Sequence, residues 1–359
     1  MSKLRIAFVL GTRPEIIKLS PIIRECRNQA IPHIIIHTGQ HYSESLDSVF
    51  FDQLELPAPD YNLKAGSQSH GKQTAEMITG IEKILRKESP EHVLVQGDTN
   101  SVLAGVIAAS KLEMTLGHVE AGLRSFDRNM PEEVNRVLAD HASDYLFPPT
   151  DQSARLLEAE GITGDHVVVT GNTIVDAVYQ NVDLAEQKST VLEQYDLEPD
   201  EFYLLTAHRA ENVDDRDRFS GILQGVNELA AQTNLDAIYP IHPRAQQNIE
   251  EFGLDIPDRI QLIEPLDFLD FLYLENNSRL IFTDSGGVQE EASILQTPCV
   301  TLRDNTERPE TIDVGANQLV GTDPSGIVNG ATVMMTRSQD WSNPFGDGTA
   351  ATTILDVIL

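Results

Sequence analysis

Residues 280–291 read Leu-Ile-Phe-Thr-Asp-Ser-Gly-Gly-Val-Gln-Glu-Glu, and this stretch decides the fold of the chain. The apolar run at its start predicts a buried strand, the two glycines predict a tight connection, and a helix is expected to begin at Val288. A strand that passes directly into a helix is the repeating unit of a parallel sheet covered by helices. In open sheets of this kind, ligands bind at the carboxyl ends of the strands.

The same alternation of apolar runs and helical patterns extends along both halves of the sequence. The runs that predict strands are 6–10, 33–37, 93–96, 116–119, 145–147 and 167–170, then 202–206, 237–241, 260–263, 279–283, 299–302 and 318–320. We therefore predict the α/β class, with two doubly wound, Rossmann-like domains.

The expected domain boundaries follow from this pattern and from the length of 359 residues, which is long for one hydrophobic core. We place an N-terminal Rossmann-like domain at residues 1–170 and a C-terminal one at 171–345. The last segment, 346–359, begins with turn-forming residues and continues as a short apolar helix. We expect that helix to pack back on the first domain.

The composition argues against several classes of partner. The 26 basic and 56 acidic residues give a formal net charge of −30, which disfavours nucleic acid and anionic membrane surfaces.

No apolar stretch approaches the ~20 residues that span a bilayer, and the amino terminus lacks a secretory signal pattern, so we expect a cytoplasmic protein. High salt screens the self-repulsion of so acidic a chain, and we expect a halophilic host.

Cysteine and histidine give no sign of a metal or a cofactor. Cys26 and Cys299 lie near opposite ends of the chain, so neither a disulfide framework nor a zinc site is indicated. The ten histidines include no helical metal-binding motif, and neither a dinucleotide fingerprint nor a Walker loop is present. We predict no metal and no cofactor.

Three carboxylates lie where a reaction centre is expected. Asp98 and Glu120 each close a short apolar run and so fall at strand ends, whereas Glu132 follows Pro131 at the start of a helix. Carboxylates crowded in one crevice suit proton transfer to and from carbon. Asp98 could instead cap the helix that follows it, and Glu132 or Glu133 could simply complement a helix dipole.

Two segments offer backbone N–H groups and a helix start to a phosphate. The first segment is Gly11-Thr12-Arg13, at the end of the first predicted strand. The second is Ser285-Gly286-Gly287, at the end of a predicted strand in the second half. A carboxylate one turn into the helix that follows the second segment could accept hydrogen bonds from ribose hydroxyls. This second arrangement is the one expected of a nucleotide-sugar site. Its glycines could instead serve a tight turn alone.

Further positive charge comes from His208, Arg209 and Arg308. His208 and Arg209 end a predicted strand, so they are expected near the same strand ends as the glycines. Arg308 could instead form a surface pair with Glu307 or Glu310, which contributes little energy.

At these residues the chain resembles the non-hydrolysing UDP-N-acetylglucosamine 2-epimerases, in particular the archaeal members, over essentially its whole length. The matching motifs are residues 11–15, 97–99, 118–125, 131–136, 206–209, 284–291 and 307–310, in this order. The resemblance implies a glycosyltransferase-B-like fold with the active site in the cleft between two domains. It also implies a UDP-sugar substrate and a homodimer.

The resemblance further implies roles for individual residues. Asp98, Glu120 and Glu132 would carry out acid/base chemistry, and His208 is counted as catalytic through its action on the departing diphosphate. The residues expected to bind the substrate are Arg13, Lys18, Phe271, Ser285, Gly286, Gly287, Glu291 and Arg308.

These roles lead to a mechanism. The hydrogen on C2 of a hexosamine is not acidic, so the bond from C1 to UDP has to loosen before a carboxylate can remove that hydrogen. We expect elimination of UDP, a 2-acetamidoglucal intermediate, and re-addition of UDP after protonation of the opposite face of C2. The result is reversible conversion of UDP-N-acetylglucosamine to UDP-N-acetylmannosamine.

Other functions stay open at this point. Residues 124–131 also resemble 2-epimerases of UDP-diacetamido uronic acids, and a UDP-sugar-dependent glycosyltransferase would share the nucleotide site. A hydrolysing epimerase and a sensor that binds without turnover are the remaining alternatives. Bacterial members of the family tend to carry an Arg directly after a Gln-His pair in this region. In this chain the pair is Gln40-His41, and Tyr42 follows it. We therefore do not expect allosteric activation by the substrate of the kind that depends on this Arg.

Overall fold

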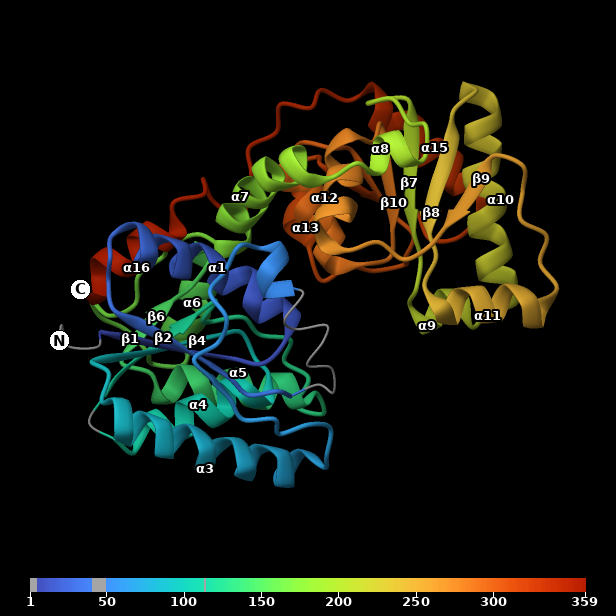
Figure 1. The fold of residues 1–359 in the computed structure, drawn as a ribbon. Helices are drawn as coiled ribbons and strands as arrows, with labels where there is room; N and C mark the ends of the chain where they lie inside the picture. Colours follow the sequence, from blue (N-terminus) through green and yellow to red (C-terminus); the bar gives the residue numbers. More distant parts are fainter. Residues whose placement is uncertain (1–4, 41–49, 113) are drawn as a thin grey trace. The chain divides into compact units, whose positions relative to one another are not determined.

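The chain forms two compact units, each with its own sheet and core. The computed structural model describes residues 5–40, 50–112 and 114–359. Met1–Gln180 and Phe345–Leu359 make up unit 1, and Asn181–Pro344 make up unit 2, each built on a six-stranded sheet (Figure 1). The sequence pattern predicts these divisions at 170/171 and 345/346.

The sheet of unit 1 is parallel throughout and has the strand order β3-β2-β1-β4-β5-β6. Its strands are β1 (Ile6–Leu10), β2 (His33–His37), β3 (Tyr61–Asn62), β4 (His92–Gln96), β5 (Thr115–Val119) and β6 (Tyr145–Phe147). Its helices are α1 (Arg13–Asn28), α3 (His70–Glu88), α4 (Asn100–Ser110), α5 (Pro131–Ala142), α6 (Asp151–Ala159) and α16 (Ala350–Ile358), and α7 (Thr173–Lys188) leads towards unit 2.

Helices cover both faces of this sheet, which explains why its central strands are apolar along their whole length. All five residues of β1 are buried, because α1 and α16 lie on one side of the strands and α3 and α4 on the other (Figure 1). The C-terminal helix α16 packs against α1, and the backbone N–H of Ala351 donates to Asp176 Oδ1 at 2.9 Å. The end of the chain is thereby joined to unit 1.

The sheet of unit 2 repeats this arrangement with the order β12-β11-β10-β7-β8-β9, again parallel. Its strands are β7 (Phe202–Thr206), β8 (Asp236–Pro240), β9 (Ile260–Ile263), β10 (Leu280–Thr283), β11 (Cys299–Thr301) and β12 (Asn317–Leu319). Its helices are α8 (Val191–Gln194), α9 (Ala210–Val213), α10 (Arg216–Thr233), α11 (Pro243–Phe252), α12 (Phe268–Asn277), α13 (Gly286–Leu295), α14 (Pro309–Asp313) and α15 (Pro324–Thr336).

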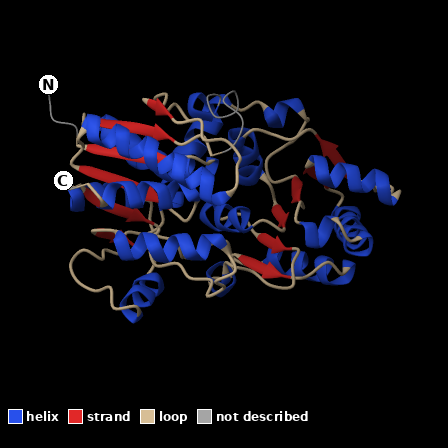
Figure 2. Cartoon of the chain, turned by 90° about the horizontal axis from the view of Figure 1, so that it is seen from below, coloured by secondary structure: helices blue, strands red, loops and turns tan. Residues whose placement is uncertain are grey.

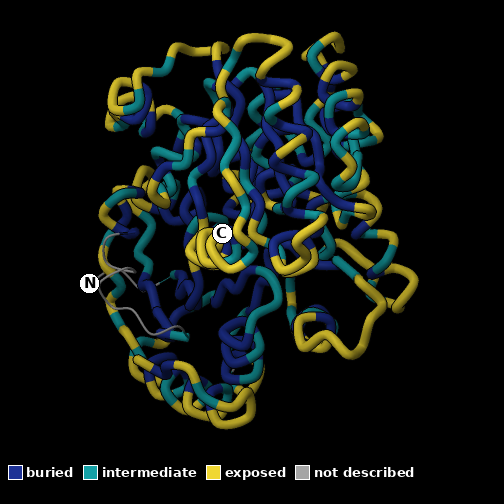
Figure 3. Tube along the Cα trace, turned by 90° about the vertical axis from the view of Figure 1, so that its right-hand side faces the viewer, coloured by how far each residue is buried: buried dark blue, intermediate teal, exposed yellow. Residues whose placement is uncertain are grey.

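Two apolar layers flank the sheet of unit 2. Side chains from α10, α11 and α15 form one layer, and side chains from α8, α12 and α13 form the other. Figure 2 shows the strands of each unit enclosed by helices, and Figure 3 shows buried backbone inside and exposed turns outside. Within the described part of the chain, no helix is long and apolar enough to cross a membrane.

Each sheet has a point where its strand order reverses. In unit 1 the chain moves outward from β1 to β2 and β3, then returns to place β4 on the other side of β1, and unit 2 does the same around β7 and β10. Ligands of doubly wound sheets bind at such reversals, outside the carboxyl ends of the strands. Residues 11–13 and 97–99 lie at the reversal in unit 1, and residues 207–209 and 284–287 lie at the reversal in unit 2.

One predicted strand is absent from the structure, and one observed strand was missed. Residues 167–170 form only an isolated bridge from Val167 to Leu146. The N–H groups of Val168 and Thr170 donate to the Leu146 and Pro148 carbonyls, but Pro148 has no N–H to continue the ladder. The edge strand β3 was not predicted, since two residues give no periodic pattern. The comparison of His41 and Tyr42 with bacterial sequences concerns positions outside the described residues.

Candidate active site

Glu120 is held at the end of β5 by three side chains from distant parts of the sequence. Its Oε1 accepts from Lys18 Nζ at 2.6 Å and from Asn172 Nδ2 at 3.5 Å, and its Oε2 accepts from Gln96 Nε2. The Glu120 side chain is only 7% exposed. A buried carboxylate needs such partners, because an unpaired one would lose its solvation without compensation.

The backbone at Glu120 is unusual in a way that fits a functional position. Its φ of +67° lies in the left-handed region, which costs a glutamate about 1 kcal/mol or more. Gly97, at the end of the neighbouring β4, has φ +82°, and a Cβ there would lie 4.0 Å from Glu120 Oε2. Tertiary contacts hold this conformation, because the N–H of Glu120 donates to the Phe147 carbonyl at 3.1 Å and the carboxylate contacts Lys18 and Gln96.

Asp98 lies at the end of β4 and pairs with a cation from α5. Arg136 Nη2 contacts Asp98 Oδ2, and Asn135 Nδ2 donates to the Asp98 carbonyl at 2.9 Å. Asp98 is not the helix cap that the sequence left open. The cap of α4 is Thr99, whose Oγ1 accepts from the N–H groups of Ser101 and Val102 at 3.1 and 3.3 Å.

The structure separates the roles of Glu132 and Glu133 at the start of α5. Glu133 is buried, and its carboxylate accepts from the N–H groups of Ser125 and Phe126 at 2.8 and 3.1 Å and pairs with Arg136. Burial opposes ionisation of Glu133, but these donors outweigh it and lower its pKa. Glu132 is exposed and has no polar partner among the described residues. Glu133 therefore holds the loop, and Glu132 remains accessible to a ligand.

The glycine loop after β1 already contains a carboxyl group of its own. Glu15 is buried, and its carboxylate accepts from Gly11 N and Thr12 Oγ1 at 2.8 Å and from Thr99 Oγ1 at 2.6 Å. Burial raises the pKa of Glu15 to about 7, because these hydrogen bonds only partly offset it. The side chain that this loop presents outward is Arg13, which is exposed and lies 5.7 Å from the Phe50 ring centre.

In unit 2 a buried carboxylate organises the end of β7. Asp284 accepts from the N–H groups of His208 and Arg209 at 3.0 Å and from Asn212 Nδ2 at 3.1 Å, and His208 Nδ1 lies 3.2 Å from its Oδ1. Burial opposes ionisation of Asp284, but these contacts outweigh it and lower its pKa. The His208 ring stays 44% exposed and is oriented by Asp284.

Helix α13 begins directly after Asp284 with Ser285 as its N-cap, and the Ser285 side chain makes no capping hydrogen bond. Gly286 and Gly287 do not have positive φ, so no tight turn requires them. A Cβ at either glycine would meet its nearest atom at 3.9 Å, which is ordinary contact. The glycines thus leave the amino end of this helix open, which favours close approach of a ligand.

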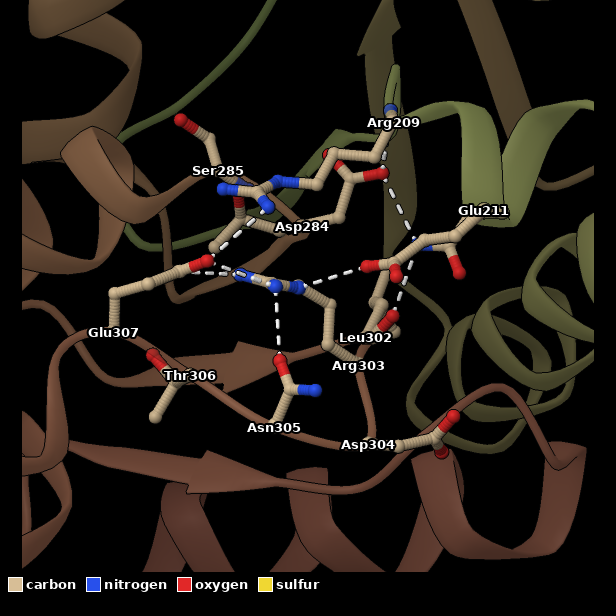
Figure 4. A network of polar contacts seen from close by, with 12 residues as sticks. Arg209, Glu211, Asp284, Ser285, Leu302, Arg303, Asp304, Asn305, Thr306 and Glu307 are labelled. Carbon is tan, nitrogen blue, oxygen red and sulfur yellow. Dashed lines mark hydrogen bonds and ion pairs between the residues drawn. The ribbon is translucent and has the colours of Figure 1, made fainter. Parts of the chain in front are cut away.

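A buried arginine fixes the loop that carries Arg308 (Figure 4). Arg303 is 4% exposed, and its guanidinium contacts Glu307 Oε2 at 2.6 Å and Oε1 at 3.0 Å, and Glu211 Oε1 at 2.9 Å. The hydrogen bonds from Arg303 lower the pKa of Glu307 to about 2. Arg308 itself pairs with the buried Glu290, Nε to Oε1 at 2.5 Å, and its Nη1 donates to the Glu307 carbonyl at 3.0 Å.

The two remaining candidates lie on α12 and α13. Phe271 is half-buried and packs against the apolar layer of α8, α12 and α13. Glu291 is half-buried and neighbours Glu275, whose pKa is raised first by complete burial and then by the Glu291 carboxyl. Within the described residues, no group of three or more His, Cys, Asp or Glu side chains forms a metal site.

Sequence reasoning missed several residues that hold these groups. They are Glu15, Gln96, Asn172, Arg136 and Arg303. Glu15 and Arg136 fall inside recognised motifs, so their polarity was a usable signal. Asn172 had none, because its proximity to Glu120 exists only in the folded chain.

Comparison with known proteins gives a consistent result. The profile of the UDP-N-acetylglucosamine 2-epimerase family matches residues 24–359. A UDP-N-acetylglucosamine 2-epimerase from Methanocaldococcus jannaschii is 51% identical over 361 residues, which cover 99% of both proteins. The structure of UDP-GlcNAc 2-epimerase from that organism matches with a TM-score of 0.92 at 50% identity, over 99% of each chain.

A second structure of the M. jannaschii UDP-GlcNAc 2-epimerase, in complex with UDP-GlcNAc and UDP, matches with a TM-score of 0.83 at 51% identity, over 99% of each chain. The similarity therefore extends across both units. This chain belongs to the UDP-N-acetylglucosamine 2-epimerase family, whose members are isomerases.

Proposed function

We propose that this chain interconverts UDP-N-acetylglucosamine and UDP-N-acetylmannosamine without hydrolysing them. The observation that carries the proposal lies in unit 1, where Asp98 and Glu120 end two paired strands and each carboxylate contacts a cation, Arg136 and Lys18 respectively. The accessible Glu132 completes a set of three. Proton removal and delivery at one carbon require such a set, because a single fixed carboxylate serves only one face.

The proposed reaction is an elimination followed by an addition. A carboxylate takes the proton from C2, the C2–H electron pair forms the C1–C2 double bond, and the C1–O electron pair leaves with UDP. The 2-acetamidoglucal then accepts a proton on the opposite face of C2, and a diphosphate oxygen attacks C1. Asp98, Glu120 and Glu132 are the candidates for these proton transfers.

Stabilising the departing diphosphate is the second requirement. We assign this task to Arg13, His208, Arg308 and the amino end of α13 at Ser285, Gly286 and Gly287. Glu291 is assigned to the ribose hydroxyls and Phe271 to the uracil. The orientation of His208 by Asp284 and the fixation of the Arg308 loop by Arg303 support this assignment, because they preorganise positive charge.

The proposed function is tested by incubating the purified protein with UDP-N-acetylglucosamine alone and following the products by NMR. UDP-N-acetylmannosamine should appear with no acceptor added and with no stoichiometric release of UDP. Net release of UDP with N-acetylmannosamine would indicate a hydrolysing enzyme, and no reaction would indicate a transferase or a sensor. A parallel incubation with the UDP-diacetamido uronic acid decides which sugar is turned over faster.

We also propose that the protein works as a homodimer in a cytoplasm of high salt. The net charge of −30 supports the second point, since molar salt shortens the Debye length to about 3 Å and screens self-repulsion. Sedimentation equilibrium tests the dimer. Thermal unfolding at increasing potassium chloride tests the salt adaptation, and a melting temperature that did not rise at molar salt would argue against it.

A further inference from the structure

A buried histidine, His118, lies beneath the proposed reaction centre and contacts two acceptors. Its Nδ1 lies 2.7 Å from Asp140 Oδ1, and its Nε2 lies 2.8 Å from the carbonyl oxygen of Gly97. The side chains of His118 and Asp140 are 1% and 0% exposed. A carbonyl oxygen accepts and never donates, so Nε2 has to carry a hydrogen.

The proton on the other ring nitrogen is decided by what surrounds Asp140. Its Oδ2 accepts from Arg124 Nη1 at 2.6 Å, and the N–H of Gly122 lies 3.2 Å from the same oxygen. Arg124 is in turn held by Glu160 at 2.7 Å. An arginine beside a carboxylate favours its ionised form, so Asp140 accepts at Oδ1 and the proton lies on His118 Nδ1.

We infer that His118 is a buried imidazolium that acts as a positioning residue, because it ties the Gly97–Asp98 backbone to Asp140 and α5. The inference rests on the proposed function, since it concerns the placement of Asp98 and Glu120. His118 precedes Glu120 by two residues on β5, and the carbonyl that it binds belongs to the residue before Asp98. One side chain thus sets the relative position of the two strand ends.

The charges around His118 make this arrangement dependent on pH. Asp140 on α5 and Glu120, directly after β5, contribute negative charge near it, and Arg124 and Glu160 complete the cluster. Burial lowers the pKa of His118, but the hydrogen bond and charge of Asp140 outweigh it and raise the pKa above the ordinary value. The stabilisation is therefore complete below ~6.5, the usual pKa of histidine, and is lost as pH rises through the folded-state value.

The protonation state is measured in the native protein without reference to turnover. In protein labelled with ¹⁵N-histidine, the resonance absent from His118→Gln identifies residue 118. Both of its ring nitrogens should carry hydrogen at pH 7. A single protonated nitrogen on residue 118 would overturn the inference, whether or not the protein proves to be an epimerase.

Kinetics test the positioning role. His118→Gln and Asp140→Asn should each lower turnover roughly 10- to 100-fold while UDP affinity stays within about twofold, because misplacement affects the reacting groups alone. Asp140→Asn should also move the loss of activity at alkaline pH to lower pH. His141→Gln is the matched control, since His141 lies next to Asp140 but is 48% exposed.

The positioning role would be overturned if both variants kept near-native turnover and lost activity at the same alkaline pH as the native protein. If His118→Gln fails to fold, the Asp140→Asn profile and the native NMR measurement still decide. If the native protein showed no epimerase activity, the proposed function would be wrong. The protonation state of His118 would still be decided independently by the NMR measurement.

Discussion

The ammonium group of Lys18 lies 2.6 Å from the carboxylate of Glu120, although the two residues are 102 positions apart in the chain. The contact joins α1 to the end of β5, and both side chains are largely buried, at 13% and 7% exposure. The resemblance had suggested Lys18 as a helper in UDP binding. Its contact in the structure is with one of the three proposed acid/base carboxylates.

Replacing Lys18 should therefore affect chemistry more than binding. We predict that Lys18→Met lowers kcat at least 10-fold, because Glu120 would lose its charged partner, while UDP affinity measured by calorimetry changes less than about threefold. Lys72→Met serves as the control, since Lys72 is 69% exposed. A variant that lost UDP affinity but kept kcat would return Lys18 to the nucleotide site.

The neighbouring glutamates of α5 should give opposite results. Glu132→Gln is expected to lower turnover by about 10²-fold with unchanged stability, because Glu132 is accessible and has no polar partner among the described residues. Glu133→Gln should lower the melting temperature, because its carboxylate holds the N–H groups of Ser125 and Phe126 and pairs with Arg136. Steady-state kinetics and thermal unfolding of both variants decide, and a reversed pattern would exchange the two roles.

Glu15 should make stability fall as pH rises. Its folded-state pKa of about 7 lies above the unfolded value of 4.5, so the folded protein binds the proton more tightly. The loss extends from about pH 4.5 to about pH 7 and amounts to roughly 3 kcal/mol. Urea unfolding at pH 5 and pH 7.5 should show this loss in the native protein and much less of it in Glu15→Gln. Equal pH dependence in the two proteins would contradict the prediction.

Arg303 should control nucleotide affinity from a distance. Arg303→Lys cannot reproduce the two-pronged contact with Glu307 together with the contact to Glu211, so the loop carrying Arg308 should loosen. We predict about 10-fold weaker UDP binding by calorimetry. Arg259→Lys is the control, because its pair with Asp236 is exposed. Unchanged affinity in Arg303→Lys would show that the loop does not need this support.

Much of the fold follows from local sequence, and the site only in part. The predicted central strands β1, β4, β7 and β10 are short apolar runs, and burial on both faces makes such runs recognisable. Asp98 and Glu120 were found because their positions follow from strand ends. Their partners Arg136 and Lys18 depend on where helices pack, and no local pattern states that.

The segment Gly11-Thr12-Arg13 shows the same limit. Its glycine, arginine and helix start predicted an anion site, and the structure places the carboxylate of Glu15 on Gly11 N. Glu15 lies within the same motif, but the orientation of its carboxylate depends on a hydrogen bond from Thr99, which follows another strand. Patterns of residues predict that donors exist, whereas tertiary contacts decide which acceptor they serve.

The central claim is that leaving-group departure makes the C2 hydrogen removable, and deuterium oxide tests it most directly. Incubation of the native protein with UDP-N-acetylglucosamine should place deuterium at C2 of both epimers, as seen by NMR and mass spectrometry, and Asp98→Asn and Glu120→Gln should slow this exchange by about 10²-fold. Interconversion of the two sugars with the original hydrogen retained at C2 would contradict the account.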